Sequence, residues 1–140
     1  MIFVESSMLL ELYLGQPRAD EARAILAAPD EKVASWLLAV EIPVVLRRAR
    51  AAGKLDAETL ETILARFDAD AARLSWRSDG EQVAARVRLD ARLARCRSLD
   101  AIHVAGAVLL REETGLAVVL ASLDDGVREV ARAVDMPVVP

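Results

Sequence analysis

Hydrophobic positions along the chain form two kinds of pattern, short continuous runs and longer stripes of helical spacing. The short runs predict five strands: Met1–Val4, Lys32–Ser35, Leu74–Trp76, Ala117–Ala121 and Val138–Val139, the last as a terminal edge strand. Continuous apolar runs of this kind are typical of parallel strands that are buried on both faces. The stretches between them repeat apolar residues every three or four positions, which predicts helices.

Start and stop signals divide these stretches into seven helices. Their predicted ranges are 8–14, 17–28, 35–52, a helix after Asp56, 80–96, 98–115 and a last helix ending near Ala133. Side chains that can accept hydrogen bonds from free backbone N–H groups are the expected helix caps. These caps are Ser6 or Ser7, Ser35, Asp56, Ser78 or Asp79, Ser98, and Asp124 or Asp125.

The alternation of strands and helices predicts one α/β domain, residues 1–140, with an open and mostly parallel sheet of four to five strands. A hydrophobic content of 54% excludes a disordered chain. The longest apolar runs are interrupted by Glu41, Asp100 or Gly115, so we expect no membrane span. No signal peptide is apparent, and Cys96 is the only cysteine. We therefore expect a cytoplasmic protein without an internal disulfide, and no catalytic role for Cys96.

Isolated carboxylates stand in four strongly apolar segments. Glu5 and Asp124 follow predicted strands, whereas Glu41 and Asp100 lie near the starts of predicted helices. For any one of them, an ordinary helix-terminal charge is an adequate explanation. In open parallel sheets, however, sites lie outside the carboxyl ends of the strands, so we expect the four acids to converge. Their mutual repulsion would be offset by a divalent metal with oxygen ligands.

The basic residues are unevenly distributed, although the net charge is −4. Nine of the 18 fall in two short clusters: Arg47, Arg48, Arg50 and Lys54, then Arg86, Arg88, Arg92, Arg95 and Arg97. These clusters are either solvated helix faces or phosphate contacts beside an acidic centre. Trp36 and Trp76 are expected in the core rather than as platforms for stacked bases.

Four short motifs follow one another along the chain. They are the strand Ile2–Val4 followed by Glu5, Ser6 and Ser7; Ser35 followed by Glu41; Leu99, Asp100, Ala101, His103 and Ala105; and Ser122 followed by Asp124. With these motifs in this order, the chain resembles the PIN-domain ribonucleases over its whole length, and in particular the VapC-type toxins of toxin–antitoxin pairs. Each motif is weak by itself, but the ordered set is fairly specific.

The resemblance implies an α/β/α three-layer sandwich and metal-dependent hydrolysis of RNA. Glu5, Glu41, Asp100 and Asp124 would form the catalytic cluster and hold one or two Mg²⁺ or Mn²⁺ ions. The neighbouring Ser7, Ser122 and Asp125 would orient these carboxylates, although the two serines are equally well explained as a helix cap and a strand residue. His103 is interpreted as structural rather than as a general base.

The resemblance also implies partners, namely a VapB-type antitoxin, an RNA substrate and a second copy of the chain in a homodimer. The apolar face of the first helix, with Met8, Leu9, Leu12 and Tyr13, either forms a groove for the antitoxin or packs on the sheet.

Glu5 departs from the family pattern, which has Asp at this position. The side chain is one methylene longer, and errors of about 1 Å in positioning can reduce a rate a hundredfold. A catalytically impaired module that still binds antitoxin or RNA is therefore the alternative function.

Overall fold

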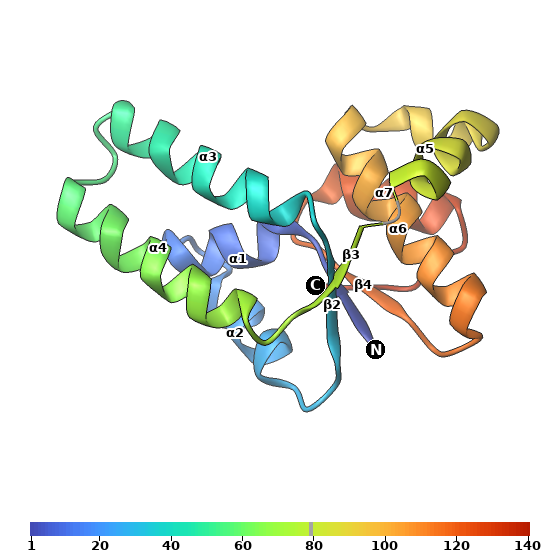
Figure 1. Cartoon of the computed structure of the whole chain (residues 1–140), viewed down its shortest axis with the longest axis horizontal. Helices are drawn as coiled ribbons and strands as arrows, with labels where there is room; N and C mark the ends of the chain where they lie inside the picture. Colours follow the sequence, from blue (N-terminus) through green and yellow to red (C-terminus); the bar gives the residue numbers. More distant parts are fainter. Residues whose placement is uncertain (79) are drawn as a thin grey trace.

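A five-stranded sheet lies between two layers of helices in the computed structural model, which describes residues 1–78 and 80–140 (Figure 1). The strands are β1 (Ile2–Val4), β2 (Lys32–Ser35), β3 (Ser75–Arg77), β4 (Val119–Ala121) and β5 (Val138–Val139). Their order across the sheet is β3-β2-β1-β4-β5, and all four pairings are parallel. The predicted strands and the α/β/α fold class are thus confirmed, with boundaries within two residues.

The helices connect successive strands and cover both faces of the sheet. They are α1 (Ser6–Tyr13), α2 (Ala19–Ala27), α3 (Leu38–Ala51), α4 (Ala57–Ala71), α5 (Gly80–Leu89), the 3₁₀ helix η1 (Ala91–Arg95), α6 (Ser98–Thr114) and α7 (Asp125–Ala133). Figure 1 shows α1 to α4 on one side of the sheet and α5 to α7 on the other. This layering follows from strands that are apolar on both faces and must be covered twice.

Successive strand residues point to opposite faces and build two separate cores. Phe3, Val33 and Leu120 pack with α5, α6 and α7, whereas Val4 and Ala121 pack with α1, α3 and α4. Gly106 lets α6 approach the sheet closely, since a Cβ atom there would lie 3.1 Å from Cζ of the fully buried Phe3. The first residues of α6 are therefore held over the carboxyl end of the central strand.

Several helix starts differ from the sequence predictions. Glu5, not Ser6 or Ser7, caps α1, and its side chain accepts a hydrogen bond from the Ser7 backbone N–H. Arg97 precedes α6 without a side-chain cap, so the prediction for Ser98 is wrong. Asp56 and Asp124 cap α4 and α7 as expected, with hydrogen bonds from the N–H groups of Thr59 and Val127.

The other helix starts shift for local reasons. Ser35 accepts a hydrogen bond from the Leu37 N–H in a turn before α3, which delays the start of that helix to Leu38. The helix expected over 80–96 stops at Leu89, because the Asp90 side chain binds the Arg92 N–H and starts η1. Of the alternative caps for α5, Ser78 and Asp79, the second lies outside the described residues.

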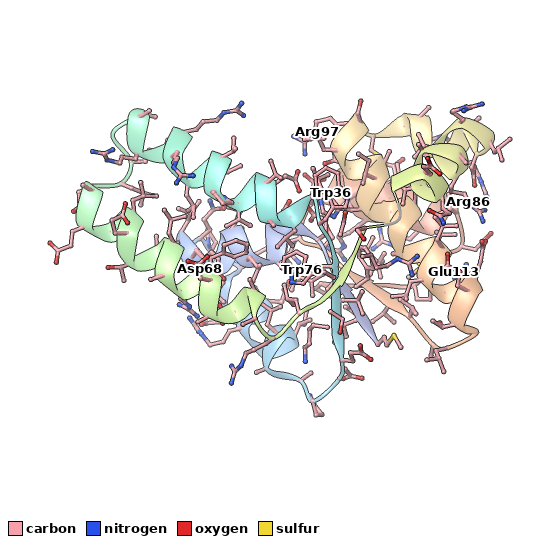
Figure 2. All side chains as sticks on the ribbon, viewed as in Figure 1. Trp36, Asp68, Trp76, Arg86, Arg97 and Glu113 are labelled. Carbon is pink, nitrogen blue, oxygen red and sulfur yellow. The ribbon has the colours of Figure 1, made fainter. Side chains whose placement is uncertain are left out.

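The tryptophans are a clear error of the sequence prediction. Trp36 is 47% exposed and Trp76 is 40% exposed, so neither belongs to the core (Figure 2). Both lie at the edge of the sheet formed by β3, where the Trp36 N–H donates to the carbonyl of Arg77. An edge strand has no further strand to cover it, which leaves these rings accessible.

The apolar face of α1 packs on the sheet, which was one of the two alternatives that the sequence left open for it. Met8, Leu9, Leu12 and Tyr13 are all buried in the core that α1 shares with α3 and α4. Leu9 and Leu12 also reach a small cavity of about 200 Å³ whose rim carries basic side chains. The basic residues of that rim are Arg23, Lys32, Arg66 and Arg73.

Candidate functional site

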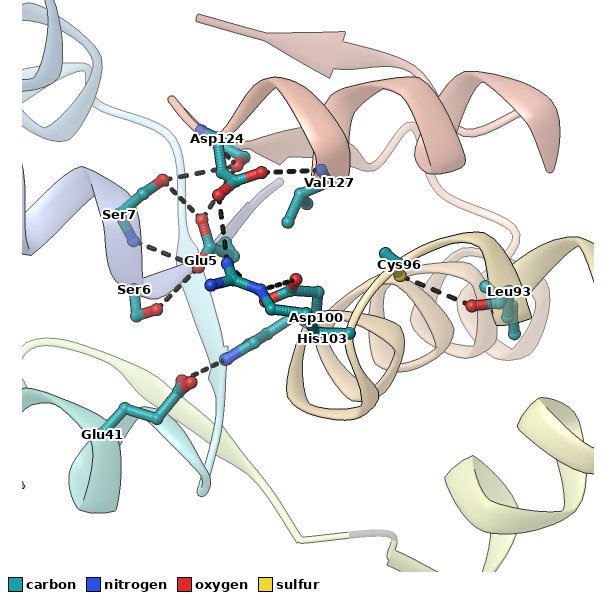
Figure 3. Close-up of polar contacts among 12 residues, drawn as sticks. Glu5, Ser6, Ser7, Glu41, Leu93, Cys96, Asp100, His103, Asp124 and Val127 are labelled. Atoms are coloured by element: carbon teal, nitrogen blue, oxygen red, sulfur yellow. Dashed lines mark hydrogen bonds and ion pairs between the residues drawn. The ribbon is translucent and has the colours of Figure 1, made fainter.

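Glu5 stands directly after β1 and is almost completely buried, with 3% of its surface exposed. Four donors satisfy its carboxylate. Oε1 accepts from Ser6 Oγ (2.6 Å) and the Ser7 N–H (3.1 Å), while Oε2 accepts from Ser7 Oγ (2.5 Å) and Ser122 Oγ (2.8 Å) (Figure 3). Hydrogen bonds of this kind offset the cost of burying a carboxyl group and fix the orientation of the Glu5 side chain.

The parallel register brings Ser122 to Glu5. Val4 pairs with Ala121 across β1 and β4, so the residues that follow each strand lie side by side. Ser7 Oγ also accepts from the Leu123 N–H at 2.8 Å, which ties the start of α1 to the end of β4. The predicted orienting role of Ser7 and Ser122 therefore has a geometric basis, since both hydroxyls contact the Glu5 carboxylate.

Asp100 and Asp124 approach each other from different helices. Asp100 lies in the first turn of α6 and is 8% exposed, and Asp124 is the N-cap of α7. One guanidinium joins them, because Arg97 Nε donates to Asp100 Oδ2 (2.8 Å) and Arg97 Nη2 donates to Asp124 Oδ2 (3.2 Å) (Figure 3). The hydrogen bond and charge of Asp100, with the charge of Asp124, raise the pKa of Arg97.

Glu41 has a separate partner. It lies in the first turn of α3, and its Oε2 is 2.6 Å from Nε2 of the fully buried His103 on α6. None of the described residues offers a hydrogen-bond partner to the other ring nitrogen, Nδ1. A ring proton on Nε2 can therefore donate to Glu41, whereas a proton on Nδ1 would find no acceptor among these residues. This contact supports the structural interpretation of His103, whose ring also orients the Glu41 side chain.

All four acids line one cavity of about 500 Å³ at the carboxyl end of the sheet. Its walls are formed by Glu5, Ser6, Ser7, Leu10, Glu41, Val45, Arg48, Arg97, Ser98, Leu99, Asp100 and Asp124. The topology thus brings the predicted acids together. Asp125 lies apart from them, with its side chain 93% exposed and nearest to Arg128.

Sequence reasoning did not foresee the part played by Arg97. It belongs to a basic cluster that was assigned to solvent or phosphate, and its contacts are with the carboxylates instead. The sequence signal that could have revealed this ion pair is the spacing, because Arg97 stands three positions before Asp100 at the start of the same helix.

Comparison with known proteins identifies the family. The model of the PIN domain matches residues 2–133. The chain belongs to the PIN-domain family. Among solved structures, FitAcB from Neisseria gonorrhoeae has a chain with the same fold, with a TM-score of 0.65, 15% sequence identity, and coverage of 100% of this chain and 97% of that one. Comparison with curated proteins finds no match.

PIN domains are generally nucleases, and they typically use divalent metal ions. The donor set of this PIN domain is suited to such an ion, because Mg²⁺ prefers oxygen ligands and is usually held by one or two carboxylates together with water. Asp100 and Asp124 already share one positively charged group, the Arg97 guanidinium, which contacts the Oδ2 atom of each. Within the described part of the chain, no group of three or more acidic, histidine or cysteine side chains is placed to hold a metal ion, so an ion here would rely on two carboxylates and water.

Within residues 1–78 and 80–140, no helix of this PIN domain is both long and apolar enough to cross a bilayer.

Proposed function

We propose that this PIN domain is the toxin of a toxin–antitoxin pair and a metal-dependent endoribonuclease of the cytoplasm. The observation that carries the proposal is the pair of carboxylates Asp100 and Asp124. Both contact the Arg97 guanidinium, in a cavity that Glu5 and Glu41 also line. RNA is a substrate with one negative charge per phosphate, and an acidic site can bind it only when cations are present. Arg48, on the wall of the cavity, supplies a positive charge that would attract the phosphate groups.

Asp100 and Asp124 would hold the Mg²⁺ or Mn²⁺ ion, in the cavity that Glu5 and Glu41 also line. When bound, the ion supplies a Lewis acid that activates water and stabilises negative charge on the phosphate. Ser7 and Ser122 fix the Glu5 carboxylate, and His103 fixes that of Glu41. Water attacks the phosphorus atom, the bond from phosphorus to the leaving oxygen breaks, and that oxygen takes up a proton.

A second candidate is the catalytically impaired module. The saturation of the Glu5 carboxylate by four donors favours it, since little of this side chain's hydrogen-bonding capacity remains for a metal or its water. Such a module would bind antitoxin or RNA through the same face without efficient cleavage.

The deciding experiment is cleavage of a mixed RNA pool by the purified chain, with Mg²⁺ or Mn²⁺ and with EDTA. We expect metal-dependent cleavage that Asp100→Asn abolishes and Asp125→Asn leaves unchanged, since the exposed Asp125 lies apart from the cavity. Cleavage only by the Glu5→Asp variant would support the impaired module. Absence of cleavage by both chains would overturn the nuclease.

A homodimer is proposed from exposed apolar residues. Trp36, Val40 and Val44 follow one another at intervals of four positions and are 47%, 49% and 39% exposed. Val40 and Val44 lie one turn apart on α3, and Trp36 lies in the turn that precedes this helix. Exposed apolar residues that are grouped in this way are typical of an interaction surface. Light scattering after size exclusion should give twice the chain mass, and Val40→Glu should give the single-chain mass.

A VapB-type antitoxin is proposed for the cavity between α1, α2 and α4. Its floor includes Leu9 and Leu12, and its rim carries four basic side chains against one acidic side chain, Asp70. An acidic segment with apolar residues is complementary to this net positive charge. Co-purification with the neighbouring reading frame tests this proposal. Arg73→Glu should weaken the complex, and unchanged affinity would move the antitoxin to another face.

A further inference from the structure

We propose that Arg97 is a built-in counter-cation of the acidic site, which holds Asp100 and Asp124 together until a divalent ion displaces it. The proposal deepens the function proposed above and rests on it, because a metal must be able to enter this site. It makes two claims that can be measured separately. Arg97 stabilises the metal-free protein, and Arg97 competes with the metal.

The first claim follows from the contacts of the guanidinium. Arg97 Nε and Nη2 lie 2.8 Å and 3.4 Å from the two carboxylate oxygens of Asp100, and Nη2 lies 3.2 Å from Asp124 Oδ2. The two acids come from different helices, so a single side chain links α6 to the N-terminus of α7 (Figure 3). The planar fork of arginine is suited to this, because it presents several donors in fixed directions.

The burial of the acids explains why a cation is required. The Asp100 side chain is 11% exposed and that of Asp124 is 35% exposed, and the buried Glu5 carboxylate lines the same cavity. Carboxylates gathered in this way repel one another and lose hydration, and a cation offsets both costs. In the absence of metal, Arg97 is the cation that contacts both Asp100 and Asp124.

The second claim follows from exposure and from shared atoms. The Arg97 side chain is 76% exposed, so it can leave the acids for water without a large cost. Its contacts use Oδ2 of Asp100 and Oδ2 of Asp124, so an ion that bound these two carboxylates would compete with the guanidinium for them. An ion with two charges is attracted to these oxygens more strongly than a guanidinium and repels the guanidinium at the same time.

The test uses the full chain and measures two properties for wild type, Arg97→Gln and Arg97→Lys. One is the melting temperature in EDTA, and the other is the dissociation constant for Mn²⁺ by titration calorimetry. Arg88→Gln is the matched control, because it removes the same charge from an exposed position on α5. Neither measurement depends on RNA cleavage.

For Arg97→Gln we expect a melting temperature lower by about 1–3 °C in EDTA and a Mn²⁺ dissociation constant about three- to tenfold smaller. Arg97→Lys should give intermediate values, because lysine keeps the charge and loses the fork. Arg88→Gln should leave both values near wild type.

The outcomes separate this proposal from the one on which it rests. If Mn²⁺ binds wild type and Arg97→Gln equally well, the competition is refuted while the metal site stands. If Arg97→Gln lowers only the melting temperature, Arg97 merely supports the start of α6 and the proposal fails. If none of the chains binds Mn²⁺, the proposed metal-dependent function fails, and the displacement of Arg97 fails with it.

Discussion

Ser122 Oγ, at the end of β4, donates a hydrogen bond of 2.8 Å to Oε2 of Glu5, at the end of β1. The contact joins residues that are 117 positions apart in sequence. It exists because β1 and β4 are parallel neighbours whose last residues, Val4 and Ala121, are in register. Both partners are buried, so the bond contributes to stability as well as to the orientation of the carboxylate.

Replacement of Ser122 by alanine tests the stabilising part of this contact. The buried Glu5 carboxylate loses one of its four donors, so we expect Ser122→Ala to lower the free energy of unfolding by about 1–3 kcal/mol. Urea denaturation followed by circular dichroism measures this change. Ser78→Ala is the control, because Ser78 is exposed. Equal effects of the two substitutions would contradict the prediction.

Asp124 combines a structural and a functional role that two substitutions can separate. Its Oδ1 caps α7 through the Val127 N–H (3.0 Å), while its Oδ2 contacts Arg97. Asn is as good a helix cap as Asp, so Asp124→Asn should retain nearly full stability and lose RNA cleavage. Asp124→Ala should lose cleavage and about 1 kcal/mol more stability. If the two variants were equally stable, the cap would have no energetic role.

The tautomer of the only histidine can be observed directly. Nitrogen-15 spectra that correlate ring nitrogens with ring protons should show His103 protonated at Nε2, since Nε2 faces Glu41 Oε2 at 2.6 Å. Glu41→Gln keeps an acceptor oxygen and should preserve this tautomer. A ring protonated at Nδ1 would mean that the contact with Glu41 is made differently.

The reactivity of Cys96 gives a pH-dependent prediction. Burial raises the pKa of the thiol, and the negative charge of Asp100 raises it further. Because the thiolate is the reactive form, alkylation by iodoacetamide at pH 7.5 should be slower in the folded protein than in urea. The rate in the folded protein should rise with pH beyond about 8.5, where an ordinary thiol already ionises.

The same pKa shift has a consequence for stability. A pKa that is raised on folding means that the folded state prefers the protonated thiol. The contribution to stability is present below the pKa of the unfolded thiol and is lost as the pH rises above it. Cys96→Ala should therefore reduce the loss of stability between pH 8 and pH 10, and an unchanged pH profile would contradict this.

The fold was predictable because its signals are local. Short apolar runs rich in β-branched residues, such as Val118–Leu120, are typical of buried strands, and Asp56 and Asp124 cap helices as their residue type predicts. The convergence of the four acids followed from the parallel sheet, because parallel strands present all their carboxyl ends at one edge.

The contacts between those acids were not predictable in the same way. The pairing of Glu41 with His103 joins two helices 62 positions apart, and no spacing rule covers such a distance. The exposure of Trp36 and Trp76 depends on β3 being at the edge of the sheet, and strand order cannot be derived from periodicity. Residue type alone predicted these rings in the core, but the position of β3 at the edge of the sheet leaves them exposed.

The acidic cavity lies where the two cores of the molecule meet. Glu5 and Glu41 belong to helices that pack on one face of the sheet, whereas Asp100 and Asp124 belong to helices that pack on the other. Local opening of either layer would separate the two pairs of acids while the opposite layer remained folded. If the proposed nuclease uses these acids, RNA cleavage requires both layers at once, and heat or denaturant should abolish cleavage before the bulk of the secondary structure melts.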